Sequence, residues 1–158
     1  MLLPSKIKTT IKSVELAGKI IKEAFPPMSV VFTLEDDVDV SRGDMFVREF
    51  NCPQMSQNIE LMVCWFNQKP LTEKASYTIR HTTKEAKCLI KEIRYKMNIN
   101  TLHRNEKDKT ISMNDFARIH IHTSESLFYD KYKLNKNTGS LIFIDEITNE
   151  TVGAGMIL

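Results

Sequence analysis

Apolar and polar residues alternate along several short segments of this chain, with the two-residue period of a β-strand. The clearest case is 28–34, in which Met28, Val30, Phe32 and Leu34 are apolar. Successive side chains of a strand point to opposite faces, so this spacing places the four apolar groups on one face. The segment therefore predicts a half-buried strand.

Charged residues follow that strand. Residues 35–37 are all acidic, and carboxylates cannot be buried without partners, so the sequence predicts a solvated turn there. The sequence 42–44 is Arg-Gly-Asp, a second turn signal, because glycine accepts positive φ and aspartate can bond its own backbone. A short strand is expected at 45–47. We interpret Cys52 and Pro53 as a linker.

The same pattern continues along the chain. The apolar positions of one long segment change from the register of Cys88 and Ile90 to that of Ile93 and Tyr95, which predicts a β-bulge near 91–92. Many short strands without a long helix indicate an all-β barrel or sandwich. The other expected strands are 6–16, 59–66, 76–80, 83–97, 116–122, 140–147 and 151–158, with turns at 17–19 and 148–150 and an exposed loop at 98–113.

Composition sets broad limits on the class of protein. The length of 158 residues suits one domain, or one small domain with part of another. The chain is 42% hydrophobic and 27% charged, with a net charge of +2. So mild a basic excess does not by itself argue for nucleic acid. Five lysines gather early, and they fit either a solvated strand edge or a polyanion site. They are Lys6, Lys8, Lys12, Lys19 and Lys22.

The three cysteines are widely separated and form no CxxC pair, which argues against a disulfide scaffold and fits a reducing cytosol. No apolar run approaches the roughly 20 residues that span a bilayer, and residues 1–4 are too short for a signal peptide. We expect a cytoplasmic protein without a membrane segment. Cys64 and Cys88 lie in apolar strands and are expected in the core.

Neither phosphate-binding nor metal-binding patterns are strong. A P-loop needs GxxxxGK[ST], and none of the five glycines lies in such a frame. Gly153 and Gly155 lie in a terminal strand with no helix after it, which favours close strand packing. The acidic run 35–39 could hold a hard cation but fits a solvated turn. His120 and His122 share a strand face and could bind zinc, although no third ligand is evident and Arg118 would repel a cation.

An aromatic group leaves two interpretations open. The side chains could form a base-stacking platform for a single strand, or they could pack in a core or against a neighbouring domain. We favour packing. The group comprises Trp65, Phe66, Tyr77, Tyr95 and Phe143.

Four ordered motifs resemble the large, GTPase-type subunit of the bacterial sulfate adenylyltransferase family. They are TLEDDVDVSRGDM at 33–45, VCWFNQKPL at 63–71, IRYKMNINTL at 93–102 and GSLIFIDEITNETVGAGM at 139–156. Residues 2–16 are a looser match to the preceding barrel strand. The proline pair at 26–27 and Ala117 depart from the family, and they affect only local turn geometry.

The resemblance implies a translation-factor-like architecture. Residues 1–50 would be the C-terminal part of a truncated β-barrel like domain II of elongation factor Tu, and 51–158 a β-barrel like domain III. GTP and magnesium would bind a GTPase domain outside this segment, so no catalytic, cofactor-binding or metal-binding residue is expected here. The half-barrel would leave strand edges unpaired.

The family converts ATP and sulfate to adenosine 5′-phosphosulfate and pyrophosphate in sulfate assimilation. By resemblance, a small subunit carries the transfer, GTP hydrolysis drives it, and these barrels brace and bind partners. One alternative is a tRNA-binding or RNA-binding barrel that uses Lys6, Lys8, Lys12 and the loop 104–109. The other is an assembly domain with no link to nucleotide state.

Overall fold

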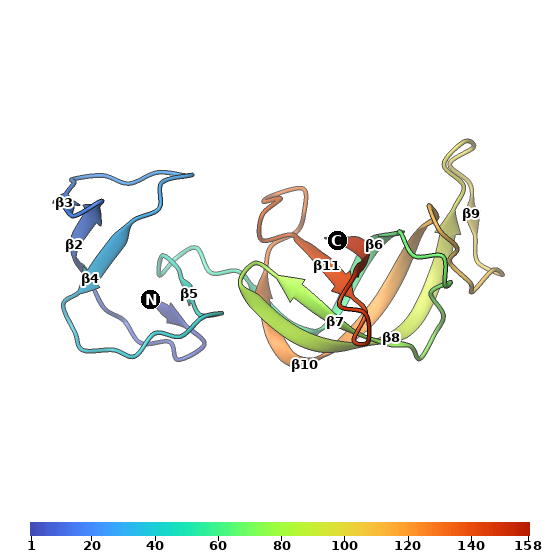
Figure 1. The fold of residues 1–158 in the computed structure, drawn as a ribbon, viewed down its shortest axis with the longest axis horizontal. Coiled ribbons are helices and arrows are strands. Elements are labelled where there is room, and N and C mark those ends of the chain that lie inside the picture. The colour runs from blue at the N-terminus through green and yellow to red at the C-terminus, as the bar shows by residue number, and fades with distance from the viewer. The chain divides into compact units, whose positions relative to one another are not determined.

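The computed structural model describes residues 1–158 and contains twelve β-strands and no helix (Figure 1). The all-β prediction is confirmed. The chain divides into two compact units, Met1–Cys52 and Pro53–Leu158. The strands are β1 (Leu2–Leu3), β2 (Ile11–Leu16), β3 (Lys19–Ile20), β4 (Val31–Leu34), β5 (Met45–Phe46), β6 (Gln54–Trp65), β7 (Ser76–His81), β8 (Lys84–Met97), β9 (Arg104–Asn105), β10 (Phe116–Tyr129), β11 (Ser140–Ile144) and β12 (Thr151–Ile157).

The second unit is a closed antiparallel barrel. Its strands follow the order β10-β6-β12-β11-β7-β8, and β8 pairs again with β10 to close the ring. The short β9 extends β8 at one end of the barrel. Closure leaves none of the six barrel strands with an open edge. The predicted antiparallel barrel is therefore confirmed.

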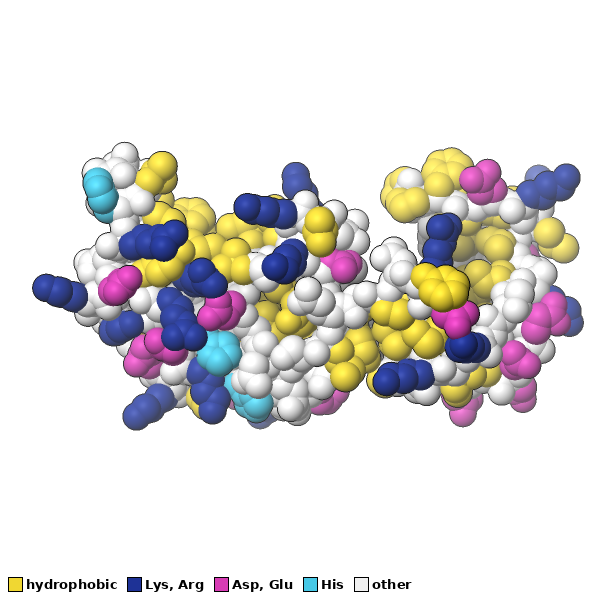
Figure 2. Space-filling view, turned by 180° about the vertical axis from the view of Figure 1, so that it is seen from behind, with side chains coloured by type: hydrophobic (Ala, Val, Ile, Leu, Met, Phe, Trp, Pro, Cys, Tyr) yellow, Lys and Arg dark blue, Asp and Glu magenta, His cyan; other side chains and the backbone are white.

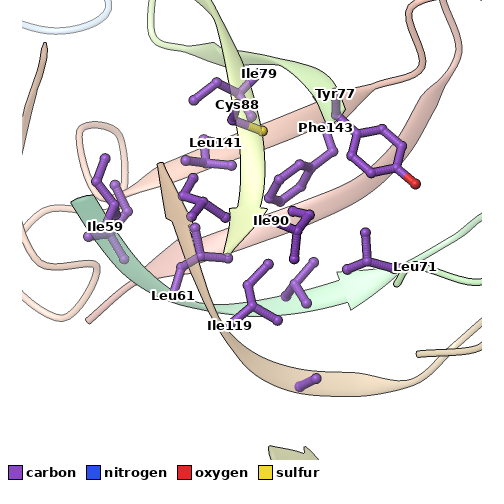
Figure 3. Packing of buried hydrophobic residues seen from close by; sticks show 14 of the residues in the cluster. Ile59, Leu61, Leu71, Tyr77, Ile79, Cys88, Ile90, Ile119, Leu141 and Phe143 are labelled. Carbon is purple, nitrogen blue, oxygen red and sulfur yellow. The ribbon is translucent and has the colours of Figure 1, made fainter. Parts of the chain in front are cut away.

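Alternate residues of the barrel strands fill its interior. From β10, Ala117, Ile119 and Ile121 point inward as the sequence predicted, and all are fully buried. Figure 3 shows Ile59 and Leu61 from β6 packed with Ile119 and other apolar groups. Burying one such side chain stabilises the fold by about 1.5–3 kcal/mol. The interior of the barrel is thus a packed apolar core.

Three aromatic rings form one end of this core. Trp65 packs edge to face on Tyr77 at a centroid distance of 5.2 Å, and Phe143 completes the group at 6.3 Å from each. The indole Nε1–H of Trp65 donates to the carbonyl of Lys69 at 2.8 Å. A Cβ at Gly153 would lie 2.7 Å from the indole ring. Gly153 therefore allows close packing, as the sequence predicted.

The long strands match the expected pattern and add detail. The register of β8 against β10 shifts twice, which leaves Lys91 and Arg94 as extra residues. The shift at Lys91 confirms the bulge predicted near 91–92, and the shift at Arg94 was not predicted. β10 also continues beyond 122, to Tyr129. The loop 98–113 was expected to be exposed throughout, but Ile111 is fully buried and pairs with Leu71, so the expectation was wrong at that residue.

The first unit has two small sheets. β2 pairs with both β3 and β4, while β1 pairs with β5. The predicted strands at 6–16 and 28–34 are shorter than expected. The turn after β2 is confirmed, with positive φ at Ala17 and Gly18, and the acidic turn is exposed. Only Leu2 and Leu3 are buried hydrophobic residues in this unit. That it is part of a larger barrel stays a prediction.

His81 is a buried polar residue at the end of β7, only 2% exposed. Its Nε2 lies 2.8 Å from the carbonyl of Thr138, and a carbonyl only accepts, so Nε2 carries the proton. The Thr138 hydroxyl in turn donates to the Asp130 carboxylate at 2.7 Å. Burial lowers the pKa of His81, and the Thr138 carbonyl and the Asp130 charge only partly oppose it.

We predict that the free energy of unfolding falls as pH drops below 6.5, the ordinary pKa of histidine. Below that pH, His81 binds a proton in the unfolded chain but not in the folded protein. The free energy of unfolding therefore falls as the pH drops from 6.5 towards the lowered pKa of His81 in the folded protein. Urea unfolding at pH 7.5 and 5.5 measures the loss, and the loss should shrink in His81→Phe. An equal loss in the variant would contradict this account.

We also predict that Gly153→Ala lowers the free energy of unfolding by about 1–3 kcal/mol, because the added methyl group overlaps the Trp65 ring. Urea unfolding followed by tryptophan fluorescence is the measurement. Thr151→Ala, at an exposed position of the same strand, is the control and should change stability by less than about 0.5 kcal/mol. Equal stability of the two variants would refute the packing argument.

Candidate interaction surface on the barrel

The outer faces of β6, β8 and β10 bring charged side chains from distant parts of the sequence together. Across β10, Glu60 of β6 lies opposite His120, which in turn lies opposite Glu92 of β8. At the next outward-facing position of β10, Arg118 lies opposite Tyr95 of β8. These positions alternate with the buried ones, so the strands that build the core also position the outer residues.

Glu60 joins two arginines on this face. The Arg118 guanidinium donates to Oε2 of Glu60 through Nε at 3.1 Å and also through Nη2, while Arg94 donates to Oε1 at 3.3 Å. Arg94 also pairs with Glu92 at 2.7 Å. The hydrogen bond from Arg118 is the main reason that the pKa of Glu60 is lowered. The same bond raises the pKa of Arg118, so both groups stay charged.

Two further basic groups complete a hollow of about 490 Å³ that we call the charged hollow. Arg104 stacks over the Tyr95 ring at 4.8 Å, and Lys109 donates to the carbonyls of Ile93 and Arg94. Neither has a carboxylate within 4 Å, and the four basic and three acidic groups leave a net charge of +1. The hollow is lined by Glu60, Glu92, Arg94, Tyr95, Arg104, Glu106, Lys109 and Arg118.

Beside the charged hollow, the outer face is apolar. Met62 follows Glu60 on the same face of β6 and lies between Arg118 and Met156. The next row joins Phe116, Cys64, Ala154 and Ile142 across four strands. All six apolar side chains are half-buried. We call them the apolar strip: Met62, Cys64, Phe116, Ile142, Ala154 and Met156.

Part of the apolar strip forms the floor of a groove of about 680 Å³, with Arg80 and Tyr132 also in its lining. Cys64 lies in this groove on the outer face, so its predicted place in the core was wrong. Partial burial raises the pKa of its thiol. Cys88 does lie in the core, where burial raises its pKa to about 12 and keeps it protonated at neutral pH.

The chemistry of the charged hollow favours recognition. A general acid or base works best with a pKa near the working pH, whereas the ion pair moves the pKa values of Glu60 and Arg118 away from neutrality. The guanidinium groups can bind carboxylates or phosphates, and the apolar strip can exclude water. Figure 2 shows basic side chains gathered on the barrel, with acidic side chains between them and apolar side chains adjacent.

The other residues predicted for chemistry do not converge. His120 and His122 do share a face, but the Nδ1 of His122 is 3.0 Å from the amide oxygen of Asn58. No group of three His, Cys, Asp or Glu side chains in residues 1–158 is arranged to hold a metal ion. The acids of 35–39 are exposed. The five early lysines are also exposed, and Lys8 pairs with Glu49.

The predicted aromatic group divides between two environments. Trp65, Tyr77 and Phe143 belong to the core, while Phe66 is 44% exposed and Tyr95 lies beneath Arg104. No stacking platform is therefore formed by the whole group. The sequence did contain one signal for the charged hollow, because Glu60 is the only charged residue in the apolar run 59–66.

We predict that Glu60→Gln lowers the free energy of unfolding by about 1 kcal/mol, since it weakens two partly exposed ion pairs. The effect should shrink in 1 M salt, which screens surface charges. Glu106→Gln is the matched control, because Glu106 lines the same hollow without an ion pair. Urea unfolding at both salt concentrations is the measurement. An equal loss in the control would show that the Glu60 pairs are not the cause.

Comparison with known sequences gives consistent matches. The family described as GTP-eEF1A C-terminal domain-like matches residues 58–158. The chain is 40% identical over its whole length to sulfate adenylyltransferase subunit 1 of Bacteroides fragilis, covering 33% of that protein. It is 36% identical over 99% of its length to the bifunctional enzyme CysN/CysC of Rhodopirellula baltica, covering 24% of it. The chain thus spans about a quarter to a third of these relatives.

Comparison with solved structures supports the fold. The crystal structure of sup35 complexed with GDP matches all of this chain and 39% of its own, with a TM-score of 0.87 at 14% sequence identity. At that identity the likeness concerns the fold alone. No helix in the structure is long and apolar enough to cross a membrane.

Proposed function

Since the chain belongs to the GTP-eEF1A C-terminal domain-like family and is homologous over its whole length to sulfate adenylyltransferase subunit 1, we propose that it is a non-catalytic, partner-binding part of such a subunit. The partner is the small subunit of the enzyme, and the setting is cytoplasmic sulfate assimilation. The observation that carries the proposal is the 40% identity across all of the chain.

In the proposed reaction, a sulfate oxygen attacks the α-phosphorus of ATP, and pyrophosphate leaves. The product, adenosine 5′-phosphosulfate, contains a high-energy anhydride, so a coupled reaction must drive its formation. GTP hydrolysis, with magnesium, on a GTPase domain of the same subunit supplies the drive. Coupling requires states that differ in their contacts with nucleotide and partner.

The properties of the chain suit a mechanical role. A closed barrel with a filled core moves as one body, which lets it transmit a change at one surface to another. The charged hollow holds firmly ionised groups, and none of the five glycines lies in a phosphate-binding frame. We therefore expect the chain alone to catalyse neither adenylyl transfer nor GTP hydrolysis.

One alternative function has an observation in its favour. Arg104 and Lys109 have no carboxylate partner and could contact the phosphates of an RNA. Against this, Glu60, Glu92 and Glu106 leave the hollow with a net charge of only +1, and the adjacent apolar strip offers a phosphate backbone no favourable contact. The partner-binding role is therefore better supported.

The test is calorimetric titration of the chain with the small subunit of sulfate adenylyltransferase from the same organism. We expect saturable binding of one chain per small subunit, with a dissociation constant of about 10 µM or tighter, and no pyrophosphate release from ATP and sulfate by the chain alone. An unrelated protein of similar charge is the control. Absence of binding at about 100 µM, or binding of RNA that falls steeply with salt instead, would overturn the proposal.

A further inference from the structure

We propose that the charged hollow and the apolar strip form one docking surface for an acidic protein segment that carries an apolar anchor. The inference rests on the proposed function, because the segment belongs to the small subunit. It adds a location on this chain and a chemical description of what binds there.

The two parts are continuous because they share strands. Arg118 and Met62 lie opposite each other on β10 and β6, and Glu60 and Met62 are successive outward residues of β6. The backbone N–H of Leu158 donates to the Glu60 carbonyl at 3.0 Å, so the 39% exposed Leu158 extends the apolar side next to Glu60. A partner that contacts one part therefore reaches the other.

The apolar strip lies where a free barrel would be expected to present polar residues. Outward positions of a solvated antiparallel strand are usually polar, yet six apolar side chains from four adjacent strands line up here. Two of the side chains in the groove are small, Cys64 and Ala154, so the groove can accept a larger side chain. Met62 and Met156 are flexible and adapt to an incoming surface. An apolar patch with a charged rim is typical of protein interfaces.

The net positive charge of the charged hollow indicates the chemistry of the partner. Arg104 and Lys109 have no carboxylate partner. Lys109 donates to two backbone carbonyls, so its third N–H and the Arg104 guanidinium are the donors left for carboxylates on the docking segment. A second copy of this chain would present the same net positive hollow, and a symmetric contact would oppose like charges. An RNA and an acidic protein segment would both meet the three carboxylates of the hollow. The protein segment can also place an apolar side chain on the apolar strip, which a sugar-phosphate backbone cannot do, and it brings no second net positive hollow into the contact.

The apolar half of the surface is tested with Met156→Asp in the same titration against the small subunit. We expect binding about tenfold weaker or worse, because a carboxylate would be desolvated in the centre of the interface. Ile147→Asp is the matched control, since Ile147 is 90% exposed at the turn between β11 and β12. It should bind as the wild type does. Circular dichroism of each variant verifies the fold.

The charged half is tested with Arg104→Glu, which breaks no ion pair and should weaken binding about fivefold or more. It should also reduce the salt dependence of the association rate. Lys87→Glu is the control, because it reverses the charge of a side chain that is 76% exposed. It should bind as the wild type does.

The outcomes separate this inference from the proposed function. If the wild-type chain does not bind the small subunit, the proposed function fails first. If the wild type binds and both Met156→Asp and Arg104→Glu bind equally well, the docking surface is wrong while the proposed function stands. Loss of binding in the two control variants as well would also refute the location. Self-association of the chain or binding of RNA through the same residues would refute the acidic segment.

Discussion

The pairing of β10 with both β6 and β8 is the constraint on which the barrel depends. This one strand closes the ring, so its inner residues complete the core and its outer residues join two otherwise separate strands. Glu60 and Arg94 lie on β6 and β8, and they meet only because Arg118 and its neighbours on β10 lie between them. Core packing and the charged hollow therefore have the same structural origin.

The bulges in β8 explain how so many polar groups converge. An unbroken alternation from Ile90 would bury Glu92 and Arg94 and expose Ile93. The extra residue at Lys91 returns Ile93 to the core, and the extra residue at Arg94 places Tyr95 opposite Arg118 on the outside. Bulges commonly redirect side chains in this way near functional surfaces. Tyr95 can then support the Arg104 guanidinium, which is otherwise free.

Much of the barrel could be predicted from local alternation, because inward positions such as Ile119 and Ile121 are apolar and their neighbours are polar. Ile111 was missed because one apolar residue in a polar loop carries no period, and its burial depends on distant Leu71. Cys64 was assigned to the core because it lies in an apolar strand, and the sequence of such a strand does not distinguish an apolar residue on the outer face from one on the inner face. The ion pairs of Glu60 required the register between strands far apart in sequence, which no local pattern contains.

A surface of this kind favours specificity over raw affinity. The ion pairs of Glu60 hold Arg94 and Arg118 in place before binding, which reduces the side-chain entropy lost when a partner docks. The same glutamates repel every polyanion, including an acidic segment, so a partner must also contact the apolar strip to bind well, and a flexible phosphate chain has no apolar group to place there. The apolar strip without the charged hollow would bind many surfaces. The charged hollow without the apolar strip would bind through charges that salt screens. Their adjacency on β6 is what makes the combination selective.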